Sequence, residues 1–240
     1  MIVNEQCIGC GSCIPYCGMG AISIKDKKAV IDLDECVECS VCRRSGVCPK
    51  NALEMQELDE MRKIRHQFSD PKATHPSTMI KGRGTEEIKT NDVTNRVACG
   101  RLGFGIEVGR PGIGTRFYDV QRITKALAPI GLDWEKANPL TSLIANLETG
   151  EFMHQVLNEK VLSCIIEFSV PVEKLEPIIK ALLNVQHEVE TVFSVSMIST
   201  YDADRKLPGL EELKKIGITP RPNAKTNLGM GKPGAQTKLH

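Results

Sequence analysis

The pattern of apolar and polar residues predicts alternating strands and helices over residues 96–205. Continuous apolar runs of strand length alternate there with stretches in which apolar residues recur at helical spacing. In chain order, the expected elements are a glycine-interrupted strand at 97–108, a helix at 117–130, a strand within 140–152, a strand at 161–170, a helix at 171–189 and a strand at 192–200. This order is that of the split βαβ arrangement, an antiparallel sheet covered on one face by two helices.

The pattern is weaker in the rest of the chain. Residues 57–69 are charged and contain few helix breakers, so we expect a short exposed helix there. Residues 70–95 are rich in Pro, Thr, Lys and Gly, which is typical of a linker or an extended crossing segment. Residues 219–240 are rich in Pro, Gly and basic residues and can build no core. We expect this last stretch to be disordered or to lie as an arm on a partner.

The cysteines form an internal repeat near the start of the chain. Ten cysteines are present, and eight of them fall between Cys7 and Cys48. A triplet with two residues between successive cysteines occurs twice, and a fourth cysteine follows each triplet, giving Cys7, Cys10, Cys13 and Cys17 and then Cys36, Cys39, Cys42 and Cys48. We expect a cytoplasmic protein, since no secretory leader is recognisable, and in that compartment cysteines grouped in this way bind metal rather than form disulfides.

The spacing within each triplet suits a cubane iron–sulfur cluster. Each iron of such a cluster takes one protein ligand, usually a thiolate, and in two-cluster proteins the distal cysteine of one motif binds the other cluster. We therefore expect crossed ligation, with cluster one held by Cys7, Cys10, Cys13 and Cys48, and cluster two held by Cys36, Cys39, Cys42 and Cys17. A zinc ribbon is disfavoured because it uses separated pairs of cysteines. Clusters with a purely structural role are the remaining alternative.

Residues 2–55 resemble the bacterial-type two-cluster 4Fe-4S ferredoxin family. The resemblance is carried by the motif CIGCGSCIPYC at 7–17 and by CVECSVC at 36–42 together with Cys48 and Pro49. It implies two 4Fe-4S clusters, one-electron transfer at low potential between redox partners, and an anaerobic setting. The sequence departs from the family pattern at Gly18, where proline is usual, and in having five residues between Cys42 and Cys48 where three are usual.

A glycine-dense run at 100–114 precedes the helix expected at 117–130. Gly112, Gly114 and Thr115 would present backbone N–H groups to a phosphate or carboxylate at the helix N-terminus, and Arg110 and Arg116 would add positive charge. The alternative, which we favour, is a tight turn whose glycines permit positive φ or close packing.

The remaining candidate groups carry weaker signals. Cys99 and Cys164 lie on different expected strands and are interpreted as buried, inert thiols. The histidines at 66, 75, 154, 187 and 240 are scattered, and no pair has the spacing of metal ligands.

Composition narrows the range of partners. Aromatic residues make up 4% of the chain and the formal net charge is +1, so neither stacking on single-stranded nucleic acid nor general attraction to DNA is supported. No apolar stretch approaches the ~18 residues that a membrane span requires. We expect no nucleic-acid partner and no membrane insertion, and oligomerisation is left open.

A second resemblance concerns residues 81–87 and 107–112. These segments are similar to parts of ferredoxin-dependent reductases of the 6-hydroxynicotinate reductase type, which implies reduction of a heteroaromatic acid. The flavin-bearing part that such an enzyme would have is not recognisable in the sequence, and one-electron clusters do not by themselves deliver the paired electrons of most organic reductions.

The sequence as a whole predicts an α+β protein in four segments. These are a two-cluster ferredoxin module at 1–56, a helix and linker at 57–95, a split βαβ domain at 96–205, and a short helix with an extended C-terminal arm at 206–240. We expect an electron-transfer subunit whose redox partner is a larger catalytic subunit of an anaerobic oxidoreductase. The alternatives are a reductase acting itself on an aromatic or heteroaromatic acid, and a redox-linked ligand-binding module.

Overall fold

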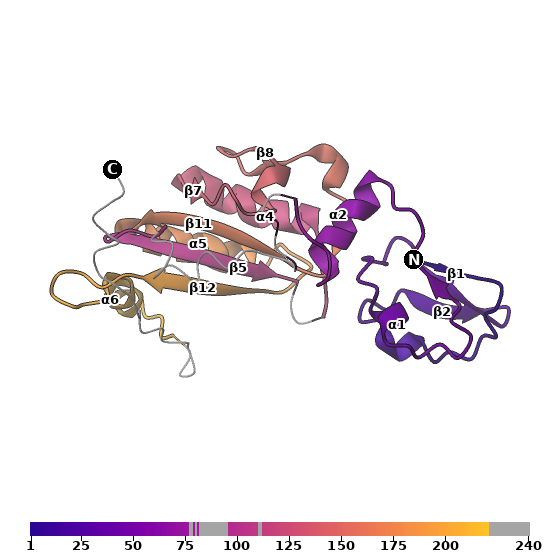
Figure 1. Ribbon diagram of the computed structural model, residues 1–240. Helices are drawn as coiled ribbons and strands as arrows, with labels where there is room; N and C mark the ends of the chain where they lie inside the picture. The colour runs from indigo at the N-terminus through magenta and orange to yellow at the C-terminus, as the bar shows by residue number, and fades with distance from the viewer. Residues whose placement is uncertain (77–78, 80, 82–95, 110–111, 221–240) are drawn as a thin grey trace.

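The computed structural model describes residues 1–76, 79, 81, 96–109 and 112–220. Figure 1 shows three parts in a row: residues 1–56, here called the cysteine-rich segment, then helix α2, then the sheet segment at 96–205. The mixture of helices and small antiparallel sheets agrees with the α+β class expected from the sequence. The predicted C-terminal arm and most of the linker lie outside the described residues.

The cysteine-rich segment is built from short strands around two cysteine loops. Strand β1 (Ile2–Val3) pairs antiparallel with β4 (Leu53–Glu54), which brings the two ends of the segment together. Strands β2 (Ile22–Lys25) and β3 (Lys28–Ile31) form a hairpin whose turn places Asp26 and Lys27 at positive φ. A short helical turn, Ile14–Tyr16, directly follows the first cysteine triplet. The short helix α1 (Val41–Arg44) includes Cys42, the last cysteine of the second triplet.

Helix α2 (Glu60–Ser69) connects the two larger parts. It begins at Asp59, whose carboxylate accepts a hydrogen bond from the Arg62 N–H at 2.8 Å, a standard N-cap. The helix expected from the sequence is therefore present, but the expectation that it is exposed was wrong. Arg65 and Phe68 are 5% and 2% exposed because the helix is packed between the cysteine-rich segment and the sheet segment.

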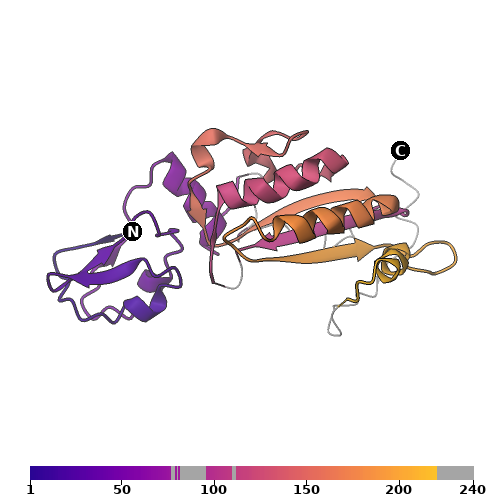
Figure 2. The ribbon, with the colours of Figure 1, turned by 180° about the vertical axis from the view of Figure 1, so that it is seen from behind.

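Four strands form the main sheet in the order β12–β5–β11–β7, and every neighbouring pair is antiparallel. Their bounds are β5 (Arg101–Val108), β7 (Asp133–Trp134), β11 (Cys164–Pro171) and β12 (Phe193–Ser199). Helices α4 (Phe117–Leu127) and α5 (Leu175–Val185) contact each other and lie on the same face of the sheet (Figure 2). The core lies between these layers and includes the fully buried Phe104, Ile106 and Ile123.

The sheet segment departs from the expected elements at one edge. The fourth strand is β7, whereas the region expected to hold a strand at 140–152 forms a separate hairpin of β8 (Ile144–Asn146) and β9 (Glu151–Phe152). Strand β7 has only two residues, one of them Asp133, so it has no apolar run that would mark it in the sequence. The expected strand at 161–170 is divided into β10 (Lys160–Val161) and β11, because Lys160–Val161 pairs instead with β6 (Thr115–Arg116).

The remaining ordered elements are short. Single helical turns occur at Ala128–Ile130, Thr141–Leu143, His154–Val156 and Val172–Lys174. Helix α6 (Pro208–Lys215) packs near β12, at the end of the sheet segment far from the cysteine-rich segment (Figures 1 and 2). In the part of the chain that the structure describes, no helix combines the length and the apolar character needed to cross a membrane.

Candidate iron–sulfur site

The first group of sulfurs surrounds one cavity in the cysteine-rich segment. Cys7, Cys10 and Cys13 from the first triplet line this cavity together with Cys48 from the second repeat. Cys13 is buried, and burial raises the pKa of its thiol above the ordinary value, with neighbouring Cys10, Cys48 and Cys7 adding like-charge repulsion. The structure therefore brings together the four cysteines that the sequence predicts for cluster one.

The second group of sulfurs shows the same combination of a triplet and a distal cysteine. Burial raises the pKa of the Cys42 thiol to about 11, and the nearby Cys39, Cys17 and Cys36 sulfurs add to the increase. Burial also raises the pKa of the Cys39 thiol, and like-charge repulsion from the Cys17 sulfur raises it further. The four cysteines predicted for cluster two thus lie close enough to repel one another when ionised.

Backbone N–H groups point at several of these sulfurs. The Ala21 N–H donates to Cys17 Sγ at 3.2 Å and the Ala52 N–H donates to Cys48 Sγ at 3.2 Å, so the two repeats make equivalent contacts. The Ala29 N–H donates to Cys7 Sγ at 3.3 Å. Hydrogen bonds of this kind stabilise negative charge on cluster thiolates and help to set the reduction potential.

The donor set fits a cubane cluster better than a single ion. Over the described residues, no three Cys, His, Asp or Glu side chains converge closely enough to hold one metal ion. A cubane takes one thiolate at each of four iron corners, so its ligands stand farther apart than those of a mononuclear site. The thiols must ionise to bind iron, and the raised pKa values mean that cluster binding releases protons from both groups at neutral pH.

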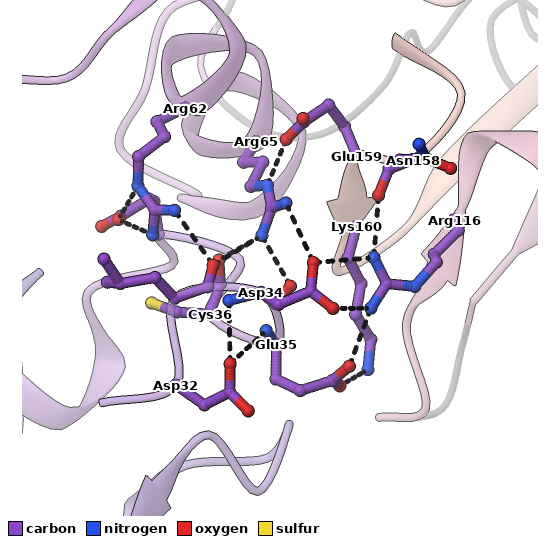
Figure 3. A network of polar contacts seen from close by, with 12 residues as sticks. Asp32, Asp34, Glu35, Cys36, Arg62, Arg65, Arg116, Asn158, Glu159 and Lys160 are labelled. Carbon is purple, nitrogen blue, oxygen red and sulfur yellow. Dashed lines mark hydrogen bonds and ion pairs between the residues drawn. The ribbon is translucent and has the colours of Figure 1, made fainter. Parts of the chain in front are cut away.

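Helix α2 supplies contacts to the cluster-two loop that the sequence analysis missed. Arg65 Nη1 donates to the carbonyl oxygens of Leu33, Asp34 and Cys36 at 3.0, 2.7 and 3.1 Å. Its Nε donates to the Glu159 carboxylate of the sheet segment. Figure 3 shows the Arg65 guanidinium between this loop and Glu159. The signal in the sequence is faint, since Arg65 is one of several charged residues on an amphipathic helix.

Other groups near cluster two carry charge as well. The carboxylate of Glu38, fully buried between Cys36 and Cys39, pairs with the Arg62 guanidinium and with the Met1 amino group. The Arg44 guanidinium pairs with Asp70, just after α2, and donates to the Cys39 carbonyl at 2.6 Å. His66 Nδ1 lies 3.0 Å from the Glu38 carbonyl oxygen. The loop that carries Cys36 and Cys39 is therefore bordered by charged groups that are paired with one another.

The proposed anion site has a different environment from the one expected. Arg110 lies outside the described residues, and Arg116 is already paired with Asp34 at 2.8 Å and with Glu35 at 2.8 Å (Figure 3). Thr115 is buried in β6, and Gly112 and Gly114 both have positive φ, which agrees with the tight-turn interpretation. An anion at this turn stays a prediction, now without the free charge of Arg116.

The same turn contacts the cysteine-rich segment. A Cβ at Gly114 would lie 2.9 Å from Met19 Sδ and 3.0 Å from the Val161 carbonyl oxygen. Met19 follows Cys17, so the turn approaches the loop that carries one of the cluster-two cysteines. Lys160 adds an ion pair with Glu35 from the neighbouring strand β10.

The two remaining cysteines differ from each other. Cys164 is fully buried in β11, and burial raises the pKa of its thiol, as expected of an inert core cysteine. Cys99 is exposed, so the expectation of a second buried thiol was wrong. It precedes β5, and its Sγ lies 3.8 Å from the Tyr201 carbonyl oxygen.

This arrangement defines a two-cluster iron–sulfur electron carrier of the ferredoxin type. A family described as the 4Fe-4S dicluster domain matches residues 6–52, and the chain belongs to that family through this segment. The segment is an iron–sulfur electron-transfer domain with two 4Fe-4S clusters. No solved structure was found to match the chain.

Curated relatives align with the same part of the chain. The ferredoxin-like protein in the vnf region of Azotobacter vinelandii is 40% identical over 62 residues, which cover 25% of this chain and 94% of the relative. The pyruvate synthase subunit PorD of Methanothermobacter marburgensis is 38% identical over 53 residues, 22% of this chain and 59% of the relative. One subunit of the ion-translocating oxidoreductase complex of Methanosarcina acetivorans is 38% identical over 55 residues, 23% of this chain. The chain spans only 20% of the length of that relative.

Proposed function

We propose that this protein is an electron-transfer subunit that passes single low-potential electrons to or from a catalytic subunit of an anaerobic oxidoreductase complex. The observation that carries the proposal is the crossed grouping of sulfurs, with Cys48 beside the first triplet and Cys17 beside the second. Crossed ligation makes both repeats part of both clusters, so the segment holds two carriers at a fixed separation.

A catalytic partner is favoured by the chemistry of the clusters. A 4Fe-4S cluster transfers one electron at a time, whereas most organic reductions need two, and a flavin, molybdenum or tungsten group in a partner would supply the pairing step. Two relatives are named as subunits, one of a pyruvate synthase and one of an ion-translocating oxidoreductase complex. We extend to this chain only the role of a redox subunit.

The sheet segment is proposed to be the docking part of the protein. Its strand order β12–β5–β11–β7, with two helices on one face, supports a split βαβ domain at 96–205. The ion pairs of Arg116 and Lys160 with Asp34 and Glu35 support a fixed attachment of the 1–56 module. We propose that this attachment holds the clusters in place relative to a partner bound by the sheet domain in the cytoplasm.

The experiment that tests the proposal is anaerobic purification of the chain from its native host. We expect a stoichiometric larger subunit carrying flavin, molybdenum or tungsten to co-elute, and roughly eight irons per chain from two four-iron cubanes. A chain that elutes alone and reduces an aromatic acid with reduced viologen as the electron donor would overturn the proposal in favour of a reductase. A lone chain that binds a metabolite without turnover would point to a ligand-binding module.

A further inference from the structure

The position of Arg65 links cluster two to the sheet segment. Residue 65 lies outside the 6–52 stretch that matches the ferredoxin family, on a helix that follows it. Its side chain is 6% exposed and connects three carbonyl oxygens of the loop leading to Cys36 with the carboxylate of Glu159. A buried guanidinium held in this way has few alternative positions, because each displaced contact would leave a polar group unpaired.

The surroundings of cluster one differ from those of cluster two. Its cavity is lined by residues of the cysteine-rich segment alone, from Val3 to Leu53, and the Cys10 side chain at its edge is exposed. The contacts that Arg62, Arg65 and His66 of α2 make with the cysteine-rich segment reach the loop between Leu33 and Glu38. Among the described residues, the environments of the two clusters therefore differ in one clear respect: the cluster-two loop is joined to the sheet segment through Arg65 and its buried ion pair with Glu159.

We propose that Arg65 is a positioning residue of cluster two, and that its ion pair with Glu159 couples the reduction potential of cluster two to the contact with the sheet segment. This inference rests on the two-cluster ligation proposed above. Reduction adds one negative charge to a cluster, and the Arg65 guanidinium stabilises that charge. Glu159 offsets part of this effect, so any change that loosens the Glu159 contact makes cluster two easier to reduce.

The coupling is reciprocal. If the Glu159 contact lowers the potential of cluster two, reduction of cluster two must weaken that contact by the same free energy. Among the described residues, the other charged or titratable groups that face this loop are Arg44, Asp70, Arg62, Glu38 and His66, together with Asp34, Glu35, Arg116, Lys160 and the Met1 amino group. All of these groups are retained when Glu159 alone is neutralised, so the effect of Glu159 can be measured by itself.

The test is a potentiometric titration of the full chain with dithionite, followed by electron paramagnetic resonance. Signals are assigned to the clusters with the variants Cys48→Ser and Cys17→Ser. We expect Glu159→Gln to raise the potential of cluster two by about 59 mV, a tenfold change in its one-electron reduction equilibrium. The potential of cluster one should stay unchanged and serves as an internal reference. Glu60→Gln, which removes an exposed ion pair with Lys63 on the same helix, is the matched control.

A second variant separates charge from shape. Arg65→Lys keeps the positive charge but replaces a planar group that reaches three carbonyls with a single ammonium. We expect the potential of cluster two to remain close to the original value, with an altered resonance line shape for cluster two alone. Equal shifts of both clusters in Glu159→Gln, or no shift of cluster two, would overturn the inference. If the chain did not hold two 4Fe-4S clusters, the unmodified protein would not show two separate cluster signals. That failure would therefore be distinguished from failure of the Arg65 inference.

Discussion

Arg116 and Asp34 join the two largest parts of the protein across 82 positions of the sequence. The two nitrogens of the guanidinium donate to the two oxygens of the carboxylate at 2.8 and 3.3 Å, and Nη2 also reaches Glu35. The hydrogen bond from Arg116 holds the pKa of Asp34 below its ordinary value. The contribution of the pair to stability is therefore present above the unfolded pKa of ~3.9 and is lost as the pH falls through the lower folded value.

Removal of this contact should free the orientation of the cysteine-rich segment more than it lowers stability. The Asp34 side chain is 69% exposed, and exposed pairs contribute no more than about 1 kcal/mol. We expect Arg116→Ala to broaden the distance distribution in small-angle X-ray scattering, and high salt to broaden that of the unmodified chain in the same direction by screening. Lys125→Ala, which removes an exposed pair with Glu151 within the sheet segment, should leave the distribution unchanged. An unaltered distribution in Arg116→Ala would show that other contacts suffice.

Replacement of the distal cysteines should damage the clusters in a crossed manner. Cys48 lines the cavity of the first triplet, so Cys48→Ala should impair the cluster of Cys7, Cys10 and Cys13 while the other cluster keeps its signal. Cys17→Ala should have the opposite effect. Iron content should fall from roughly eight toward four per chain in each variant, as measured by iron analysis and magnetic resonance. Loss of the cluster in the same repeat as the replaced cysteine would contradict crossed ligation.

Gly9 and Gly18 offer a matched pair of substitutions at the first cysteine repeat, one inside its triplet and one directly after Cys17. Gly9 has a φ of +67°, and a Cβ there would lie 2.2 Å from the Lys27 carbonyl oxygen. Gly9→Ala should destabilise the loop by at least the ~1–2 kcal/mol typical of a left-handed L-residue, and should speed the loss of cluster one to a chelator. Gly18 has open space around its Cα, so Gly18→Ala should keep the original rate. Equal rates in the two variants would show that the Lys27 contact does not limit cluster one.

The buried His75 predicts a pH dependence of stability. It is 6% exposed and packs edge-on against Phe68, and burial lowers the pKa of its imidazole. Between that lowered value and the unfolded pKa of ~6.5 the unfolded chain binds more protons, so stability should rise with pH and level off above it. Thermal unfolding measured anaerobically at a series of pH values should show a smaller slope in His75→Phe. If stability changes with pH equally in the unmodified chain and in His75→Phe, the pH dependence arises from other groups.

The sequence determined the two-cluster character of the N-terminal segment and most of the regular elements, because both depend on local spacing. The triplets at 7–13 and 36–42 place three thiols on one loop whatever the rest of the chain does. The long strands β5 and β11 carry apolar runs, and the helices α4 and α5 carry apolar residues at helical spacing, since all four contribute buried side chains to the core.

Only the tertiary structure decided what surrounds the second cluster. Arg65 and Glu159 are ordinary charged residues 94 positions apart in the sequence, and their contact depends on how α2 packs between the cysteine-rich segment and the sheet segment. Local sequence made Arg116 a candidate for an anion site, with a tight turn as the favoured alternative, and the fold pairs Arg116 with Asp34. An ion pair between distant segments leaves no periodic or spacing signal, because it is fixed by the packing of whole elements rather than by neighbouring residues.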